Sequence, residues 1–411
     1  MSITRRVFLR NGAMAIAGTA TVPAFLASAV GGESLGNRKK RLVIIFQRGA
    51  ADGLNCVVPH GEPAYYWMRP SIHIPRNAVI DLDGFFGLHP SLSAFEPLWR
   101  QRFLAIVHAA GSPHSSRTHF EAQNFLESGT PGVKATVDGW LNRALQSLPG
   151  ERPAFPAIFS GPTLPRILSG CVPAVAFTHI GDLEVRERNS RFGFMANNFE
   201  AMYSQSADSV SHGTGQQIFE TAKMLKSTHA STYISAAGAS YPQGCFGDSL
   251  KQLAQLMKAN PDVQAAFADI GGWDHHSDEG GTQGQLANIL REFSRSLVAF
   301  WTDLGDLAED TLIVTMSEFG RSARENRNRG TDHGHANVMF VIGGQVRGGK
   351  VYGHWPGLDR SQLHEGRGLA VTTDFRRVLG EAVDRQLDSK DLDDVFPGFD
   401  NQTGKFLRYL G

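Results

Sequence analysis

Continuous apolar runs alternate with helical patterns along most of the chain. Each run is rich in β-branched residues, which is typical of a strand buried on both faces of a parallel sheet. Because such runs recur in both halves of the sequence, they predict one large sheet. The five runs are residues 41–46, 103–108, 263–270, 311–316 and 338–342.

Amphipathic patterns with helical spacing lie between these runs, at residues 120–126, 250–257, 285–307 and 374–383. Gly129 follows the first pattern as a natural C-cap, and Asp374 opens the last as an N-cap. Strands that alternate with helices predict an α/β fold, in which helices flank a mostly parallel central sheet.

The stretch from about 151 to 240 is less regular than the rest of the sequence. It contains five prolines up to Pro173, and polar runs follow them. We interpret it as an irregular insertion over the sheet, within a single domain that spans residues 41–411.

The N-terminus has the features of an export signal. The segment Thr4-Arg5-Arg6-Val7-Phe8-Leu9 resembles the twin-arginine signal, which a receptor reads as an address. A mild apolar run from Gly12 to Leu26 follows, and the small residues Ala27-Ser28-Ala29 fit a cleavage site. The twin-arginine export machinery is therefore an expected partner, and the mature protein is expected in the periplasm or outside the cell.

These features divide the N-terminal region into a signal peptide at 1–29 and a polar linker at 30–40. The apolar run is too short and too rich in Ala and Gly for a comfortable membrane span, and no other stretch reaches the roughly 18 apolar residues required. We therefore expect no stable membrane span in the mature protein.

Charge and composition exclude some classes of function. The chain has 40 Lys and Arg residues against 40 Asp and Glu, so bulk positive charge cannot drive binding to nucleic acid. Hydrophobic residues make up 41% and charged residues 19%, which predicts a packed core. Cys56, Cys171 and Cys245 have no C-x-x-C spacing and are expected as small, buried or half-buried packing residues.

Residues that can carry chemistry gather next to the predicted strands. In open α/β sheets, ligands bind at the carboxyl ends of the strands. Four of the runs are followed by such residues, and the fifth is preceded by them. In chain order these residues are Asp52, Ser116, Arg117, Thr118, Asp274, His276, Glu318, Arg321, Asp332, His333 and His335.

Several carboxylates in one place repel each other unless a cation holds them, and Asp, Glu and His together suit zinc or another divalent transition metal. Asp274 and His276 share one side of an extended chain. Asp332 and His333 point to opposite sides, so one could bind a metal while the other supports it.

Seven sequence segments, which occur in a fixed order along the chain, carry a specific resemblance to a known family. They resemble the bacterial exported family catalogued as domain of unknown function 1501, from Leu42 to about Gln386. That family in turn resembles the alkaline-phosphatase and sulfatase superfamily. Its members use an Asp after the first strand, a Ser or Thr nucleophile at a helix start, and later Asp and His groups around two metals. The segments are RGAADGLNCVVP, FGLHPSL, SSRTHFEAQNFLESG, DGWLNRAL, IGGWDHH, TMSEFGR and GTDHGHAN.

The resemblance implies an alkaline-phosphatase-like fold and a metal-dependent hydrolase that acts on small anionic phosphate or sulfate esters. It implies a divalent ion, zinc, with manganese or calcium as alternatives. Thr118 matches the nucleophile best and Ser116 is the runner-up, while Arg117 or Arg321 would stabilise charge. His335 is a candidate ligand or general acid. The implied metal ligands are Asp52, Asp274, His276, Glu318 and His333, with Asp332 as a further candidate.

The sequence also departs from the superfamily pattern. Phe319 stands where the superfamily has a metal-binding His, and His119 or Asp332 could substitute for it. The segment from Ser112 to Arg117 breaks the spacing of the formylglycine sulfatase signature, which argues against that class. The loss of the His at Phe319 favours an alternative function, an exported binding or assembly protein that keeps the fold, with or without a structural metal, and has no turnover.

Overall fold

The computed structural model describes residues 39–150, 153, 155–180 and 233–411. The predicted signal peptide, most of the linker and residues 181–232 of the predicted insertion lie outside these residues. The described part of the chain from Lys40 onward forms one compact unit.

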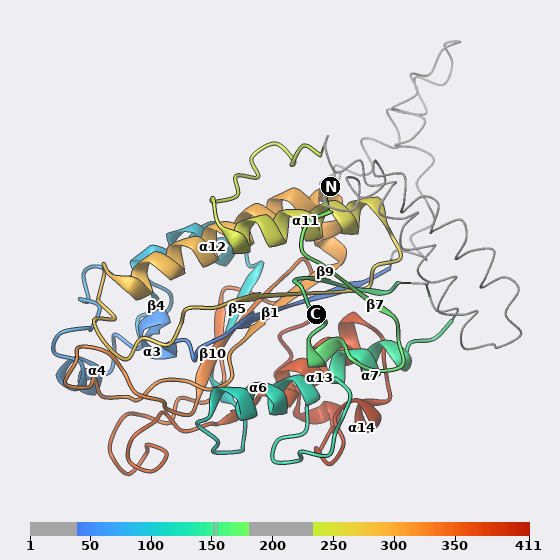
Figure 1. Cartoon of the computed structure of the whole chain (residues 1–411). Coiled ribbons are helices and arrows are strands. Elements are labelled where there is room, and N and C mark those ends of the chain that lie inside the picture. The colour runs from blue at the N-terminus through green and yellow to red at the C-terminus, as the bar shows by residue number, and fades with distance from the viewer. Residues whose placement is uncertain (1–38, 151–152, 154, 181–232) are drawn as a thin grey trace, which may run out of the picture. The chain divides into compact units, whose positions relative to one another are not determined.

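A large sheet lies at the centre of this unit (Figure 1). Its strand order is β11-β5-β10-β9-β1-β8-β6-β7, and β12 also pairs with β5. Of the described strands in this sheet, β10 alone runs antiparallel to its neighbours. The predicted α/β architecture with a mostly parallel sheet is therefore confirmed. The strands are β1 (Arg41–Gln47), β5 (Leu104–Gly111), β6 (Ala157–Ser160), β7 (Ala174–Phe177), β8 (Ala265–Ile270), β9 (Thr311–Met316), β10 (Asn337–Gly343), β11 (Lys350–Tyr352) and β12 (Thr373–Asp374).

Apolar residues on both faces explain why β1 lies in the middle of the sheet. All seven of its residues are buried. Val43 and Ile45 pack into the hydrophobic core on one face, and Leu42, Ile44 and Phe46 pack into the core on the other. This alternation follows from the two-residue period of a strand.

Helices cover both faces of the sheet (Figure 1). On one face, α11 (Cys245–Ala259) and α12 (Gln285–Leu304) pack together over the first core. On the other face lie α6, α7, α13 and α14. The bounds of these four are α6 (His119–Ser128), α7 (Trp140–Gln146), α13 (Phe375–Gln386) and α14 (Leu392–Val395).

Shorter elements complete the fold. Short helices are α3 (Gly53–Cys56), α4 (Pro63–Met68) and α5 (Glu96–Arg100). The 3-10 helices are η1 (Pro90–Phe95), η2 (Arg166–Leu168), η4 (Gly305–Asp310) and η5 (Thr403–Lys405). A second sheet has the order β2-β4-β3, with β2 (Val57–Val58), β4 (Gly87–Leu88) and β3 (Ile80–Asp81).

The predicted helix ends agree with the structure in two of three cases. Gly129 caps α6 with a left-handed φ of 69°, and the side chain of Asp374 accepts a hydrogen bond from the backbone N–H of Arg376. The helix predicted to reach residue 307 ends at Leu304 instead. Gly305 terminates it, with a φ of 55°, and the chain continues as η4.

The predicted insertion over the sheet needs correction in its first part. Strands β6 and β7 pair in parallel with β8 and with each other, so they extend the central sheet at its edge. Each has only four residues, and β7 is half-buried over most of its length. The cysteine prediction also needs correction, because Cys56 is buried but Cys171 and Cys245 are exposed. Within the described ranges, no helix is long and apolar enough to cross a membrane.

Candidate metal centre

Four loops meet at one edge of the central sheet. The carboxyl ends of β1, β5, β8 and β9 lie at this edge, because β1 is parallel to β8 and β9, and β10 is antiparallel to both β5 and β9. His119 opens the helix after β5, Asp274 follows β8, and Glu318 follows β9. Since β10 runs in the opposite direction, the loop that precedes it brings His333 to the same edge.

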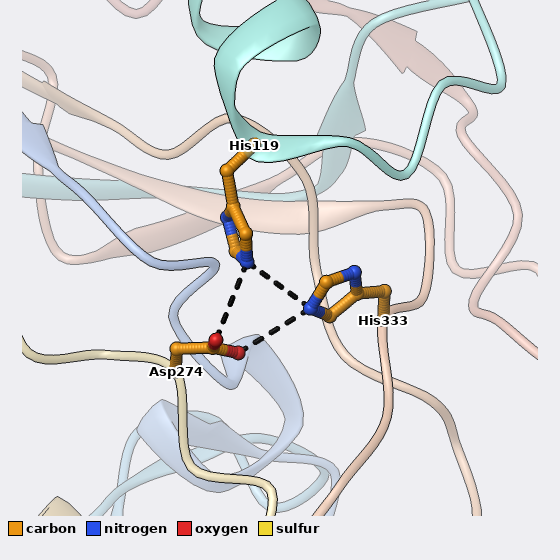
Figure 2. A group of neighbouring side chains, drawn as sticks. All are labelled: His119, Asp274 and His333. Carbon is orange, nitrogen blue, oxygen red and sulfur yellow. Dashed lines mark hydrogen bonds and ion pairs between the residues drawn. The ribbon is translucent and has the colours of Figure 1, made fainter.

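His119, Asp274 and His333 point their side chains toward one another (Figure 2). The Nε2 atoms of the two histidines lie 3.1 Å apart. The Asp274 carboxylate lies 3.5 Å from Nε2 of His119, through Oδ2, and 3.3 Å from Nε2 of His333, through Oδ1. Each residue offers one atom to a common point, which is the arrangement that a metal ion needs.

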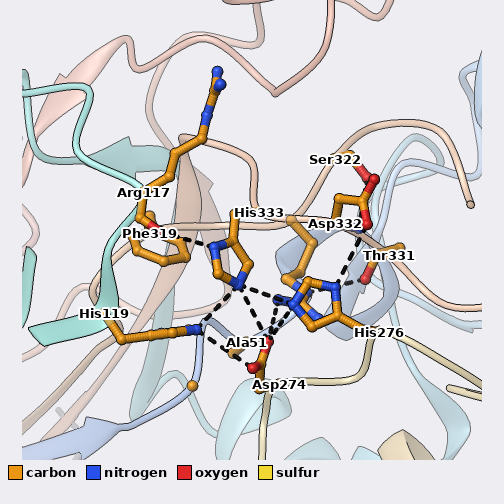
Figure 3. Close-up of polar contacts among 12 residues, drawn as sticks. Ala51, Arg117, His119, Asp274, His276, Phe319, Ser322, Thr331, Asp332 and His333 are labelled. Atoms are coloured by element: carbon orange, nitrogen blue, oxygen red, sulfur yellow. Dashed lines mark hydrogen bonds and ion pairs between the residues drawn. The ribbon is translucent and has the colours of Figure 1, made fainter.

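His276 joins this group from the other side of Asp274 (Figure 3). Its Nε2 atom lies 3.0 Å from Oδ1 of Asp274 and 3.0 Å from Nε2 of His333. We call these four residues, His119, Asp274, His276 and His333, the histidine cluster. Asp274 and His276 are 44% and 45% exposed, so a ligand from solvent can reach the cluster.

The other nitrogen of each imidazole faces an oxygen atom. Nδ1 of His119 lies 2.8 Å from Oε1 of Glu318, and Nδ1 of His333 lies 2.8 Å from the backbone oxygen of Arg117. Nδ1 of His276 lies 3.5 Å from Oδ1 of Asp332. These partners assign the proton of the neutral rings to Nδ1, so the Nε2 lone pairs face each other and the Asp274 carboxylate. Such lone pairs repel at 3 Å unless a proton or a metal ion lies between them, so the residues fit a metal ion.

Glu318 supports His119 and does not join the converging atoms. Its Oε1 accepts hydrogen bonds from the backbone N–H of Gly49, from Nε2 of Gln123 and from Nδ1 of His119, each at 2.8 Å. Burial raises the pKa of Glu318, but the hydrogen bonds from His119 and Gln123 outweigh burial and keep the pKa below its ordinary value. The sequence predicted Glu318 as a metal ligand. In the structure its carboxylate lies on the Nδ1 side of the His119 ring and is not among the converging atoms.

Asp332 has a similar place behind His276. Its Oδ1 faces Nδ1 of His276, and its Oδ2 lies 3.4 Å from Nη2 of Arg367. His333 is among the converging atoms and Asp332 is not, and which of the two binds a metal stays a prediction.

Asp52 lies away from the histidine cluster, in a fully buried ion pair with Arg69. The Arg69 guanidinium donates to both Asp52 oxygens, to Oδ1 of Asn55 and to the backbone oxygens of Ser322 and Ala323. All five guanidinium N–H groups are therefore used. The sequence predicted Asp52 as a metal ligand. In the structure its carboxylate pairs with the guanidinium of Arg69 instead.

Glu279 completes this buried group, and we call Asp52, Arg69 and Glu279 the guanidinium cluster. Burial and the neighbouring Asp52 charge raise the pKa of Glu279 well above its ordinary value. Its Oε1 is buried and has no hydrogen-bond partner among the described residues. Thr331 donates to Oε2 of Glu279 at 2.8 Å and accepts from Nε of Arg321 at 3.1 Å, which connects the two clusters.

Arg321 lies between the clusters and is 2% exposed. Its Nη1 donates to Oδ1 of Asp274 at 2.7 Å. Its Nη2 is buried and has no hydrogen-bond partner among the described residues. Buried donors are rarely left unpaired, so this nitrogen is available to a ligand oxygen or a water molecule.

A family model described as "Protein of unknown function (DUF1501)" matches residues 39–396. The chain belongs to this DUF1501 family. A search of curated proteins found no match.

Three solved structures resemble this DUF1501 protein at low identity. The C-terminal periplasmic domain of EcEptC from Escherichia coli, in complex with Zn, is 9% identical with a TM-score of 0.36, over 75% of this chain and 73% of that chain. The PsFucS1 sulfatase from Pseudoalteromonas sp. is 11% identical with a TM-score of 0.36, over 76% and 64%. The phosphonate monoester hydrolase of Agrobacterium radiobacter is 10% identical with a TM-score of 0.35, over 85% and 74%.

The predicted nucleophiles of the DUF1501 protein lie on the loop before α6. Ser116 donates from its hydroxyl to Oε2 of Glu121 at 2.6 Å. Thr118 is exposed and precedes α6 without using its side chain as a cap. The side chain of Arg117 points away from the histidine cluster (Figure 3) and forms an ion pair with Glu365 at 2.5 Å.

His335 lies outside the histidine cluster. Its ring stacks on that of His364, with centroids 3.9 Å apart. Burial lowers the pKa of His335 to about 4, so the ring is neutral at pH 7. It is not among the atoms that converge on Asp274, which leaves proton transfer as its predicted role.

Phe319 packs against two imidazole rings of the histidine cluster. Its ring centroid lies 5.0 Å from that of His119 and 4.9 Å from that of His333. His119, named from the sequence only as a possible substitute, supplies an imidazole from α6. The signal for it was its position at the first residue of the helix that follows the second predicted strand.

Proposed function

We propose that this DUF1501 protein is an exported, metal-dependent hydrolase of phosphate or sulfate esters. The observation that carries the proposal is the histidine cluster. The Nε2 atoms of His119 and His333 converge with the Asp274 carboxylate, His276 Nε2 lies beside His333 and Asp274, and every Nδ1 atom faces an oxygen that orients its ring. Outer partners of this kind accompany metal-binding histidines in proteins.

The donor set favours zinc among the candidate ions. Imidazole nitrogen suits zinc and other late transition metals, whereas calcium prefers six to eight oxygen ligands. Three imidazoles and one carboxylate are the ligand types found at zinc sites. Manganese is a weaker alternative for the same reason as calcium, because it suits oxygen-rich sites.

Each residue near the cluster has a proposed role. When bound, the ion would act as a Lewis acid and lower the pKa of a coordinated hydroxyl or water. Arg321 would donate from its unpaired Nη2 to an ester oxygen as charge develops there. Thr118 or a water molecule would be the nucleophile, because the Ser116 hydroxyl is already bonded to Glu121. Because its pKa of about 4 leaves it neutral at pH 7, His335 would accept a proton and not donate one.

Export is part of the proposal and rests on the sequence. The twin-arginine-like segment, the apolar run and the small residues at 27–29 support a cleaved signal peptide and a periplasmic or secreted location. The export machinery and a small anionic ester are the proposed partners.

An alternative function is an exported binding or assembly protein that keeps a structural metal without turnover. The packing of Phe319 on two cluster imidazoles is the observation that favours it, because an apolar ring occupies space beside the ligands. Stoichiometric metal with no hydrolysis of any phosphate or sulfate ester would support this alternative.

The deciding experiment combines elemental analysis with ester hydrolysis. We expect the mature protein, dialysed without chelator, to retain a transition metal and to hydrolyse 4-nitrophenyl esters of phosphate or sulfate. The double variant Asp274→Asn with His276→Ala should lose both metal and activity. A matched control, Asp278→Asn with His354→Ala, removes an exposed carboxylate and an exposed imidazole outside the cluster and should keep both. A cluster variant that retained metal and activity would contradict the proposal.

A further inference from the structure

The charges around the histidine cluster nearly cancel. Counting each ionisable side chain that contacts a cluster residue, with the ionic partner of each, gives four carboxylates and three guanidinium groups. Arg117 is counted because its backbone oxygen faces His333. These groups are Asp274, Glu318, Asp332 and Glu365 against Arg117, Arg321 and Arg367. One divalent ion therefore leaves the centre with about one net positive charge, because metal-bound imidazoles are neutral.

Charges farther out do not touch the cluster. Arg48, with Asp269 and Glu127, lies behind the neutral side chain of Gln123. In the guanidinium cluster, Arg69 balances Asp52, and burial raises the pKa of Glu279 well above its ordinary value, which favours its neutral form. These groups therefore add little to the charge that a ligand meets at the histidine cluster.

A second metal ion has no free carboxylate at Asp52. Both Asp52 oxygens accept from Arg69, whose remaining N–H groups are held by Asn55, Ser322 and Ala323. Displacing Arg69 would leave a buried guanidinium without its partner, which is strongly unfavourable. The chain thus supplies a fixed cation where a second ion would otherwise add two charges.

The site also offers limited hydrogen bonding to an anion. Of the guanidinium groups counted above, Arg117 and Arg367 are paired with Glu365 and Asp332, and Arg321 keeps one buried, unpaired nitrogen. One metal charge and one free guanidinium nitrogen match an anion with a single negative charge better than a dianion.

We infer, building on the proposed hydrolase function, that the centre takes one divalent ion and selects esters that carry one negative charge. The class comprises phosphodiesters, phosphonate monoesters and sulfate monoesters, and it excludes phosphate monoesters, which are largely dianionic above pH 7. In the reaction, a new bond forms from the oxygen of water to phosphorus or sulfur, and the ester bond to the leaving oxygen breaks. One water proton ends on the leaving oxygen or in solvent.

Substrates that share a leaving group test this selectivity. We would compare methyl 4-nitrophenyl phosphate and 4-nitrophenyl sulfate with 4-nitrophenyl phosphate at pH 8, each relative to its uncatalysed rate. We expect the rate enhancement for at least one monoanion to exceed that for the dianion about tenfold or more, because the second negative charge of the dianion has no positive charge left to pair with at this centre. The two monoanions distinguish phosphorus from sulfur as the reacting atom.

A charge variant tests the same point within the chain. Glu365→Gln releases Arg117 and raises the net charge by one, so the ratio of kcat/KM for dianion over monoanion should rise about two- to fivefold, the size expected for an exposed charge pair. The matched control Glu96→Gln makes the same change in an exposed ion pair with Arg100 on α5, and its ratio should stay unchanged. An unchanged ratio in Glu365→Gln would contradict the inference.

Metal content and ligand binding provide readouts that do not depend on turnover. Elemental analysis should give one ion per chain, and calorimetry should show that dimethyl phosphate binds the zinc-loaded protein more tightly than methyl phosphate at pH 8. Two ions per chain, or tighter binding of the dianion, would overturn the inference even if esters are hydrolysed. Absence of any ester hydrolysis, with the monoanion still preferred in binding, would overturn the hydrolase proposal and support the charge selectivity.

Discussion

The histidine cluster and the guanidinium cluster lie at the same edge of the sheet but differ in how their carboxylates are paired and how far solvent can reach them. In the guanidinium cluster, every Arg69 N–H group has an oxygen partner and the carboxylates are fully buried. In the histidine cluster, Nε2 lone pairs face a half-exposed carboxylate. One group therefore contains a cation that uses all of its donors on the group, whereas the other has Arg321 on one carboxylate oxygen and imidazole nitrogens that fit the proposed metal ion. The comparison separates acids that are fully paired inside the fold from an acid that solvent can reach.

Removal of the internal cation should have the largest effect on stability. Arg69→Met leaves Asp52 buried without a partner, which costs about 3–5 kcal/mol in the free energy of unfolding. Urea denaturation of the metal-free protein measures this loss. The control Arg100→Met breaks an exposed pair with Glu96 and should cost about 0–1 kcal/mol. A small loss in Arg69→Met together with lost zinc binding would reverse the assignment of the two clusters.

The next effect concerns the carboxylate behind His119. Glu318→Gln removes the charge that holds the Nδ1 proton of His119, so zinc affinity should fall about 10- to 100-fold. Competition with a chelator measures the affinity. Glu121→Gln is the matched control on α6, because Glu121 pairs with Lys134 and Ser116 and touches no cluster residue. Equal affinity in both variants would show that Glu318 does not orient His119.

The sequence predicted the fold better than the roles of the individual acidic residues. The five apolar runs became strands because burial on both faces requires such runs. Strands β6 and β7 were not predicted, because four-residue strands leave no long apolar run. The ion-pair partner of Asp52 could not be predicted either, because it is held by residues far away in the sequence. Arg69 reaches it from the end of α4, and the backbone oxygens that fix Arg69 come from residues about 250 positions later.

The histidine cluster was predicted in part for a similar reason. Asp274, His276 and His333 flank strands and could be chosen from their positions. The roles of Glu318 and His119 could not, because a carboxylate and an imidazole at one sheet edge can both bind a metal or support each other. Only the geometry shows that Nδ1 of His119 faces Glu318.

The smallest expected effect is the dependence on pH of the hydrogen bond between His119 and Glu318. The hydrogen bond to Glu318 raises the pKa of His119 above its ordinary value of 6.5 in the metal-free protein, although burial opposes it. Because the folded pKa is the higher one, this pair stabilises the fold fully below about pH 6.5, and the contribution is lost as the pH rises through the raised pKa. NMR titration of the His119 ring should therefore give a pKa above 6.5, which falls in Glu318→Gln and is absent when zinc is bound. Arg69→Met should leave that titration in place, because the guanidinium cluster does not contact His119. A His119 pKa at or below 6.5 in the metal-free protein would show that Glu318 does not hold a proton on that ring.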